Sequence, residues 1–332
     1  MNRNTKIISA AVAALGAVLS TNVMAQALVK IDGSSTVFPI TEAVAEEFQK
    51  AKKGAVRVTV GISGTGGGFK KFCRGEIDIA DASRPIKSSE MEDCKKAGIK
   101  YVELPIAFDA LTVVVNPKNP LTSISVADLK KMWEPEAQTK ITDWNQVNAA
   151  FPKQALKLYG PGTDSGTFEY FTEAVVGKAK SSRGDYTASE DDNVLVQGVS
   201  RDVGGIGYFG FAYYFENKDK LKALSISPAA GKPAVAPSEE DVLNGTYQPL
   251  SRPIFIYVNA KAAEKPEVRE FVEFYLKNGA KLTKEVKYVP LSAADYQHAA
   301  DNFKKLKTGT AFGGHSEVGV KIADLLKRDP TE

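Results

Sequence analysis

Three short segments of the sequence combine hydroxyl side chains or glycines with a predicted helix start. They are SSTVFP at 34–39, SGTGGG at 63–68 and GTDSGT at 162–167, and each follows a predicted strand. A helix N-terminus has unsatisfied N–H donors and a partial positive charge, and glycine lets the backbone approach a ligand closely. Any one segment could be an ordinary helix cap. Three of them at the carboxyl ends of strands favour a site for an oxyanion.

A fourth segment, DASRP at 81–85, adds a cation to this set. Arg84 follows the predicted strand 77–80, and its guanidinium could hold an oxyanion through two parallel hydrogen bonds. A plain surface arginine is the alternative interpretation.

Common catalytic motifs do not fit these segments. GTGGGFKK lacks the Gly-Lys-Ser/Thr of a P-loop, and GTDSGT is not a Gly-x-Ser-x-Gly nucleophile elbow. The only histidines are His298 and His315, far from the loops in sequence, so neither a histidine base nor a metal-ligand cluster is evident. We therefore expect a protein without catalytic activity, metal or cofactor.

The elements that must position the loops alternate between strand and helix, which predicts an α/β fold with largely parallel sheets. Strands are predicted at 28–31, 56–60, 77–80, 101–104, 111–116, 156–159, 204–209 and 253–258. Helices are predicted at 39–53, 69–75, 126–132, 167–176, 193–200 and 266–276.

The first 25 residues have the pattern of a secretory signal peptide. Arg3 and Lys6 precede an apolar run of about a dozen residues, which ends in small residues before Gln26. Cleavage is predicted after Ala25, with Ala27 as the alternative. The remaining chain then has a formal charge of about +1, which argues against a broad nucleic-acid surface.

Cys73 and Cys94 are the only cysteines. In an exported protein an isolated pair favours a disulfide over a metal site, with two buried thiols as the alternative.

Five strings in this chain resemble the periplasmic phosphate-binding proteins of phosphate ABC transporters (PstS-type). They are DGSSTVFP (32–39), SGTGGGFKKF (63–72), DIADASRP (78–85), GPGTDSGTFEYF (160–171) and GGIGYFGFAY (204–213), and they occur in the family's order over most of the chain. The resemblance implies a two-lobed periplasmic-binding-protein fold (type II), each lobe a mostly parallel sheet flanked by helices. It also implies two crossover strands, near 110–115 and 250–257.

The expected domain organisation follows from this fold. Residues 26–112 and 257–332 form lobe I, and residues 113–256 form lobe II. The resemblance further implies a periplasmic protein that binds inorganic phosphate and delivers it to a membrane permease. We expect a monomer that binds no nucleic acid.

Carried over by position, the resemblance assigns site residues in each loop. Ser35, Thr36 and the N–H of Val37 match the first loop. Ser63 matches the second, with Thr65 as the alternative. Ser165, Gly166 and Thr167 match the third loop.

Two positions depart from the better-known family members. Those proteins have an acidic residue, able to accept the proton of hydrogen phosphate, where this chain has Ser83. They have an arginine where this chain has Pro161, and Arg84 or, less readily, Arg183 could replace it. The replacement acid is left open among Asp164, Asp81 and Asp32.

Other classes of function stay open at this point. The same fold could bind sulfate, molybdate or a phosphonate. A phosphate-ester hydrolase and an extracellular adhesion or scaffold protein are more distant alternatives.

Overall fold

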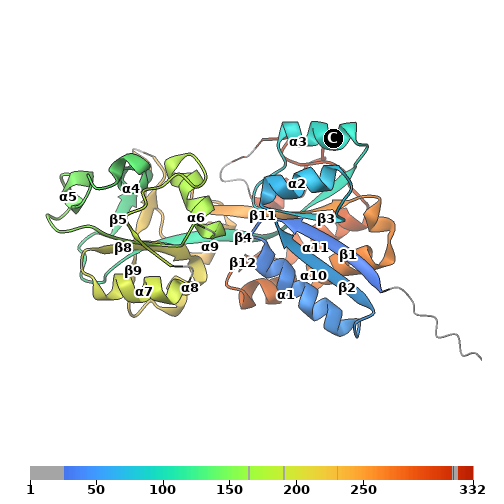
Figure 1. Ribbon diagram of the computed structural model, residues 1–332, viewed down its shortest axis with the longest axis horizontal. Helices are drawn as coiled ribbons and strands as arrows, with labels where there is room; N and C mark the ends of the chain where they lie inside the picture. Colours follow the sequence, from blue (N-terminus) through green and yellow to red (C-terminus); the bar gives the residue numbers. More distant parts are fainter. Residues whose placement is uncertain are drawn as a thin grey trace, which may run out of the picture.

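The computed structural model describes residues 26–163, 165–189, 191–229, 231–315, 317 and 321–331. Two lobes lie side by side and are joined by long strands (Figure 1). The predicted signal peptide, residues 1–25, lies outside the described residues. No helix in the described ranges is long and apolar enough to cross a membrane.

The first lobe is built mainly from the two ends of the chain. Its strands are β1 (Ala27–Gly33), β2 (Val56–Ile62), β3 (Ile79–Ala82) and β12 (Val289–Pro290), with parts of β4 (Tyr101–Val115) and β11 (Ser251–Asn259). Its helices are α1 (Phe38–Ala51), α2 (Thr65–Cys73), α3 (Ser88–Lys96), η3 (Ala262–Glu264), α10 (Pro266–Glu285), α11 (Ala293–Lys304) and α12 (Ile322–Leu325). Helix α1 packs on α10, and α2 packs on α3.

The second lobe is built from the middle of the chain. Its strands are β5 (Ser123–Ser125), β6 (Lys157–Gly160), β7 (Thr187–Ala188), β8 (Gly205–Gly210), β9 (Lys222–Ala223) and β10 (Ser225–Ser227). Its helices are α4 (Val126–Trp133), η1 (Pro135–Ala137), α5 (Trp144–Val147), α6 (Gly166–Phe171), η2 (Thr172–Val176), α7 (Asp192–Arg201), α8 (Phe211–Glu216) and α9 (Glu239–Leu243).

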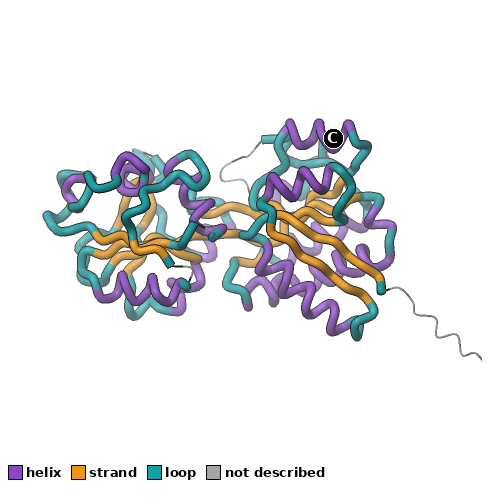
Figure 2. Tube along the Cα trace, viewed as in Figure 1, coloured by secondary structure: helices purple, strands orange, loops and turns teal. Residues whose placement is uncertain are grey.

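Strand pairing explains how the two lobes are connected. Within the lobes β1 pairs in parallel with β2 and β3, and β6 pairs in parallel with β7 and β8. Strands β4 and β11 are antiparallel and run from one lobe into the other (Figure 2). β4 pairs with β11 over Tyr101–Ala110 and with β8 over Leu111–Val115, so it changes partner where the lobes meet.

Several predicted elements differ from the observed ones. The strands predicted at 101–104 and 111–116 are one strand, β4, because the segment between them continues to pair with β11. The helix predicted from residue 69 begins at Thr65, inside the predicted glycine loop. Helix α11 was not predicted. The lobe boundaries at 112/113 and 256/257 stay predictions.

The predicted disulfide is confirmed. Cys73, at the end of α2, bonds Cys94 in α3 with an S–S distance of 2.01 Å. The bond ties together the two helices that follow the second loop and the DASRP segment.

Candidate functional site

The first loop forms a tight turn between β1 and α1. Ser34 donates its N–H to the Asp81 carbonyl (3.0 Å), and its hydroxyl accepts the Thr36 N–H (3.2 Å). The Val37 N–H donates to the Ser34 carbonyl (3.2 Å), and α1 has no side-chain cap. The turn thus already uses the Thr36 and Val37 N–H groups, which leaves the hydroxyls of Ser35 and Thr36 as side-chain donors.

The second loop places Thr65, rather than Ser63, beside the DASRP segment. The Thr65 hydroxyl lies 3.0 Å from the Ser83 hydroxyl and accepts the Ser83 N–H at 3.1 Å. Ser63 is exposed, and its hydroxyl donates to Asp32. Of the two alternatives that the sequence left open, Thr65 therefore has the better position.

Helix α2 can begin so close to the first loop because Gly68 has no side chain. A Cβ on Gly68 would lie 2.7 Å from the Cα of Gly33 and 3.0 Å from the Asp32 carbonyl. This close approach packs the first turn of α2 against the end of β1, which brings the first and second loops together.

The third loop meets the first loop across the lobe boundary. Ser165 caps α6 by accepting the Thr167 N–H at 3.2 Å. A Cβ on Gly166 would lie 2.4 Å from the Thr36 hydroxyl oxygen and 2.9 Å from the Thr36 nitrogen. Backbone from lobe II therefore touches the first loop of lobe I, and all four predicted segments gather at one place. Asp164 lies outside the described residues.

The two described candidates for the acid have different environments: Asp32 is bonded to Lys71 and Ser63, and Asp81 is fully buried. Burial alone would raise the pKa of Asp32, but its bonds to Lys71 (2.6 Å) and Ser63 outweigh burial and lower that pKa. Asp81 is fully buried and accepts from Thr41 on α1 (3.1 Å). Burial raises the pKa of Asp81 well above its usual range.

The two predicted arginines are also committed to carboxylates. Arg84 forms a fork with Glu90, with both N–O distances at 2.8 Å, and donates to the Pro85 carbonyl. Arg183 is buried in lobe II, where it bonds Asp185 and the carbonyls of Met132 and Ile141. These bonds give Arg183 a structural role within lobe II.

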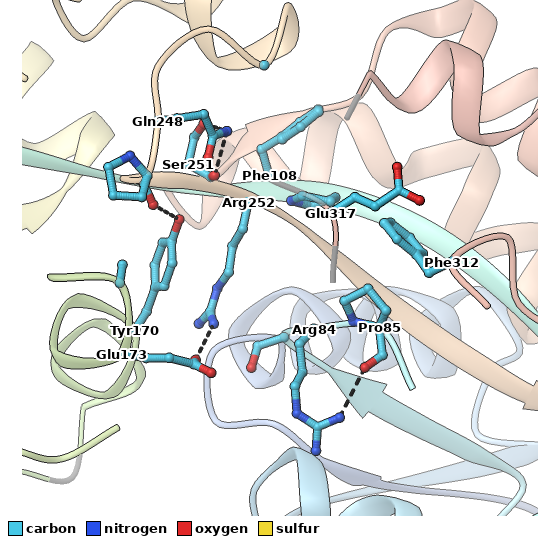
Figure 3. A pocket seen from close by; sticks show the side chains of 15 residues that line it. Arg84, Pro85, Phe108, Tyr170, Glu173, Gln248, Ser251, Arg252, Phe312 and Glu317 are labelled. Carbon is cyan, nitrogen blue, oxygen red and sulfur yellow. Dashed lines mark hydrogen bonds and ion pairs between the residues drawn. The ribbon is translucent and has the colours of Figure 1, made fainter. Parts of the chain in front are cut away.

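A pocket of about 310 Å³ at the lobe junction contains an arginine that the sequence analysis missed. It is lined by Ser83 and Arg84 from lobe I, by Tyr170 and Glu173 from lobe II, and by Arg252 at the start of β11 (Figure 3). The only signal for Arg252 in the sequence was its place within the crossover strand predicted near 250–257. No cluster of metal ligands occurs among the described residues.

The fold and the gathered loops define a class of protein. Residues 17–278 match the family model described as a PBP superfamily domain, so the chain belongs to the PBP superfamily. The predicted two-lobed α/β architecture is confirmed.

Curated relatives named PstS confirm the predicted resemblance to PstS-type proteins, and other relatives are named SphX. The chain is 62% identical to "Protein SphX" of Synechococcus elongatus, over 92% of this chain and 89% of that one. It is 40% identical to "Phosphate-binding protein PstS" of Staphylococcus saprophyticus, over 81% and 82%. A crystal structure titled "possible phosphate binding protein", from Planctomyces limnophilus, is 44% identical and has a TM-score of 0.77, covering 91% of this chain and 99% of that one.

Proposed function

We propose that the protein is an exported, non-catalytic binding protein that captures inorganic phosphate for an ABC transporter. The observation that carries the proposal is the meeting of loops from both lobes, seen in the contact between Gly166 and Thr36. The names of the PstS relatives and the predicted signal peptide support the ligand and the export.

The proposed site uses donors from each lobe. Lobe I contributes the hydroxyls of Ser35, Thr36, Thr65 and Ser83, and lobe II contributes Ser165, Gly166 and Thr167. A desolvated anion needs several such donors at once, because each one replaces part of its hydration shell. Because donors come from both lobes, phosphate binding is coupled to lobe closure. A membrane permease could then distinguish the closed, loaded form from the open, empty one.

Calorimetric titration of the phosphate-stripped protein, lacking residues 1–25, tests this function. We expect one phosphate per chain and no heat from sulfate. Thr65→Val should weaken phosphate binding at least about tenfold, because it removes a hydroxyl next to the anion, whereas Ser63→Ala should change it little.

The alternatives predict other results. Heat from sulfate or molybdate in place of phosphate would assign the site to another oxyanion. Turnover of a chromogenic phosphate ester would indicate a hydrolase. Absence of binding to every small anion would overturn the proposal.

A further inference from the structure

Arg252 is held more loosely than the other arginines near the loops. Its Nη2 lies 3.4 Å from Asp109, its Nη1 lies 3.4 Å from Glu173, and its guanidinium stacks 3.7 Å from the centre of the Tyr170 ring. Its Nε is buried and makes no hydrogen bond within the described part of the chain. Arg84, by contrast, is fixed by two bonds of 2.8 Å. Arg252 therefore has hydrogen-bonding capacity left for a ligand.

Asp109 lies on β4 directly beside Arg252, and its side chain is only 5% exposed. With Thr167 of the third loop it lines a small pocket of about 70 Å³. Arg252 lines the larger pocket together with Ser83. The Arg252–Asp109 pair thus connects two pockets, and each pocket contains a residue of the proposed phosphate site.

The pair lies on the crossover strands, and each residue lines one of the two pockets at the lobe junction. Asp109 pairs in register with Arg252 on the antiparallel strands β4 and β11, next to the point where β4 changes partner. Both residues therefore lie at the junction of the lobes.

This inference rests on the proposed function. We propose that Arg252 supplies the cation, and Asp109 the acid, that the family resemblance would place at Pro161 and Ser83. Arg252 donates to the oxygens of the bound anion. Asp109 accepts the hydrogen bond from the one protonated oxygen of hydrogen phosphate.

This assignment explains how the site could select phosphate. Sulfate has nearly the same size and charge as hydrogen phosphate but no proton to donate. An ionised, buried carboxylate accepts a hydrogen bond from hydrogen phosphate and repels sulfate. A site built to pair with one ligand hydroxyl can reject the analogue that lacks it by several orders of magnitude. Burial raises the pKa of Asp109, and the charge and hydrogen bond of Arg252 beside it oppose that rise and favour the ionised carboxylate that this discrimination needs.

The test compares phosphate and sulfate titrations of the wild type, Asp109→Asn, Arg252→Gln and Arg252→Lys. Asp109→Asn keeps the shape but removes the charge, so the preference for phosphate over sulfate should fall at least about tenfold. Arg252→Gln should weaken both anions, and Arg252→Lys should restore part of the affinity because it restores the charge. Arg74→Gln, which breaks the exposed Arg74–Glu76 pair, is the matched control and should bind as the wild type does.

Thermal unfolding of each variant shows whether it is folded. The ratio of phosphate affinity to sulfate affinity then separates a ligand contact from a structural role. A folded Asp109→Asn protein with the wild-type ratio would overturn the assignment of the acid. A folded Arg252→Gln protein with wild-type affinity would overturn the assignment of the cation. If the wild type itself bound no phosphate, the proposed function would fail first, and this inference with it.

Discussion

The carboxyl group of Asp81 lies in the core directly behind the first loop. One oxygen accepts from Thr41, whose hydroxyl lies 3.1 Å from that of Tyr275, and the other oxygen has no partner in the described part of the chain. A buried, singly bonded carboxyl is more stable protonated than ionised, which is why burial raises its pKa. It supports the loop through its backbone carbonyl rather than through a charge.

This environment predicts a pH-dependent effect of Asp81→Asn. Above about pH 4 the unfolded chain releases the Asp81 proton while the folded protein keeps it, so stability from this group is lost as pH rises. Asparagine does not titrate. The variant should therefore gain stability over the wild type as pH increases from about 4 towards the raised pKa of Asp81.

Thermal unfolding at a series of pH values measures this difference, with the exposed Asp219→Asn as the control. A difference between the Asp81 variant and the wild type that stays constant with pH would contradict the assigned protonation state.

Residue types predicted which segments meet at the lobe junction, but not how the side chains within them are arranged. Ser63 and Thr65 are equivalent candidates in the sequence. The structure distinguishes them, because Ser63 bonds Asp32 whereas Thr65 bonds Ser83. The sequence allows Arg84 to be either an anion-binding residue or a plain surface arginine, and it does not reveal the fork with Glu90, six residues away.

At the scale of elements, most strands follow from their apolar patterns, and the errors have physical causes. Two strands were predicted where β4 is continuous; its Pro105 lies opposite Phe255, next to the register shift in β11, where the missing N–H does least harm. The glycines at 66–68 suggested a loop, but Gly68 serves close packing between α2 and β1. Such packing partners are far apart in sequence, so a local pattern cannot reveal them.

The packing of α2 predicts the effect of Gly68→Ala. The added methyl would collide with the Gly33 backbone, which cannot yield as a flexible side chain can. Overpacking of this kind costs about 1–3 kcal/mol, and it should move Thr65 and weaken phosphate binding as well. Chemical denaturation and phosphate titration measure the two effects.

Gly184→Ala is the matched control for this variant. A Cβ on Gly184 would meet only Gln138, at an ordinary contact distance of 3.6 Å, so stability and affinity should stay close to wild type. If Gly68→Ala also behaved like the wild type, α2 would not depend on close approach to β1.

At the scale of the whole molecule, β4 and β11 determine how the lobes meet. The alternation of strands and helices predicted the α/β class, whereas the junction depends on pairing between segments more than a hundred residues apart. Besides the contact of Gly166 with Thr36, Lys287 of lobe I forms an ion pair with Glu216 of lobe II. The lobes thus touch at two places at the junction, which favours a site enclosed between them.

A crystal structure of the protein with phosphate tests this account most directly. We expect one phosphate between the lobes, with its oxygens about 3 Å from donors of Thr36, Thr65 and Ser83 on one side and of Ser165–Thr167 on the other. A phosphate bound by one lobe alone, or away from these loops, would contradict it.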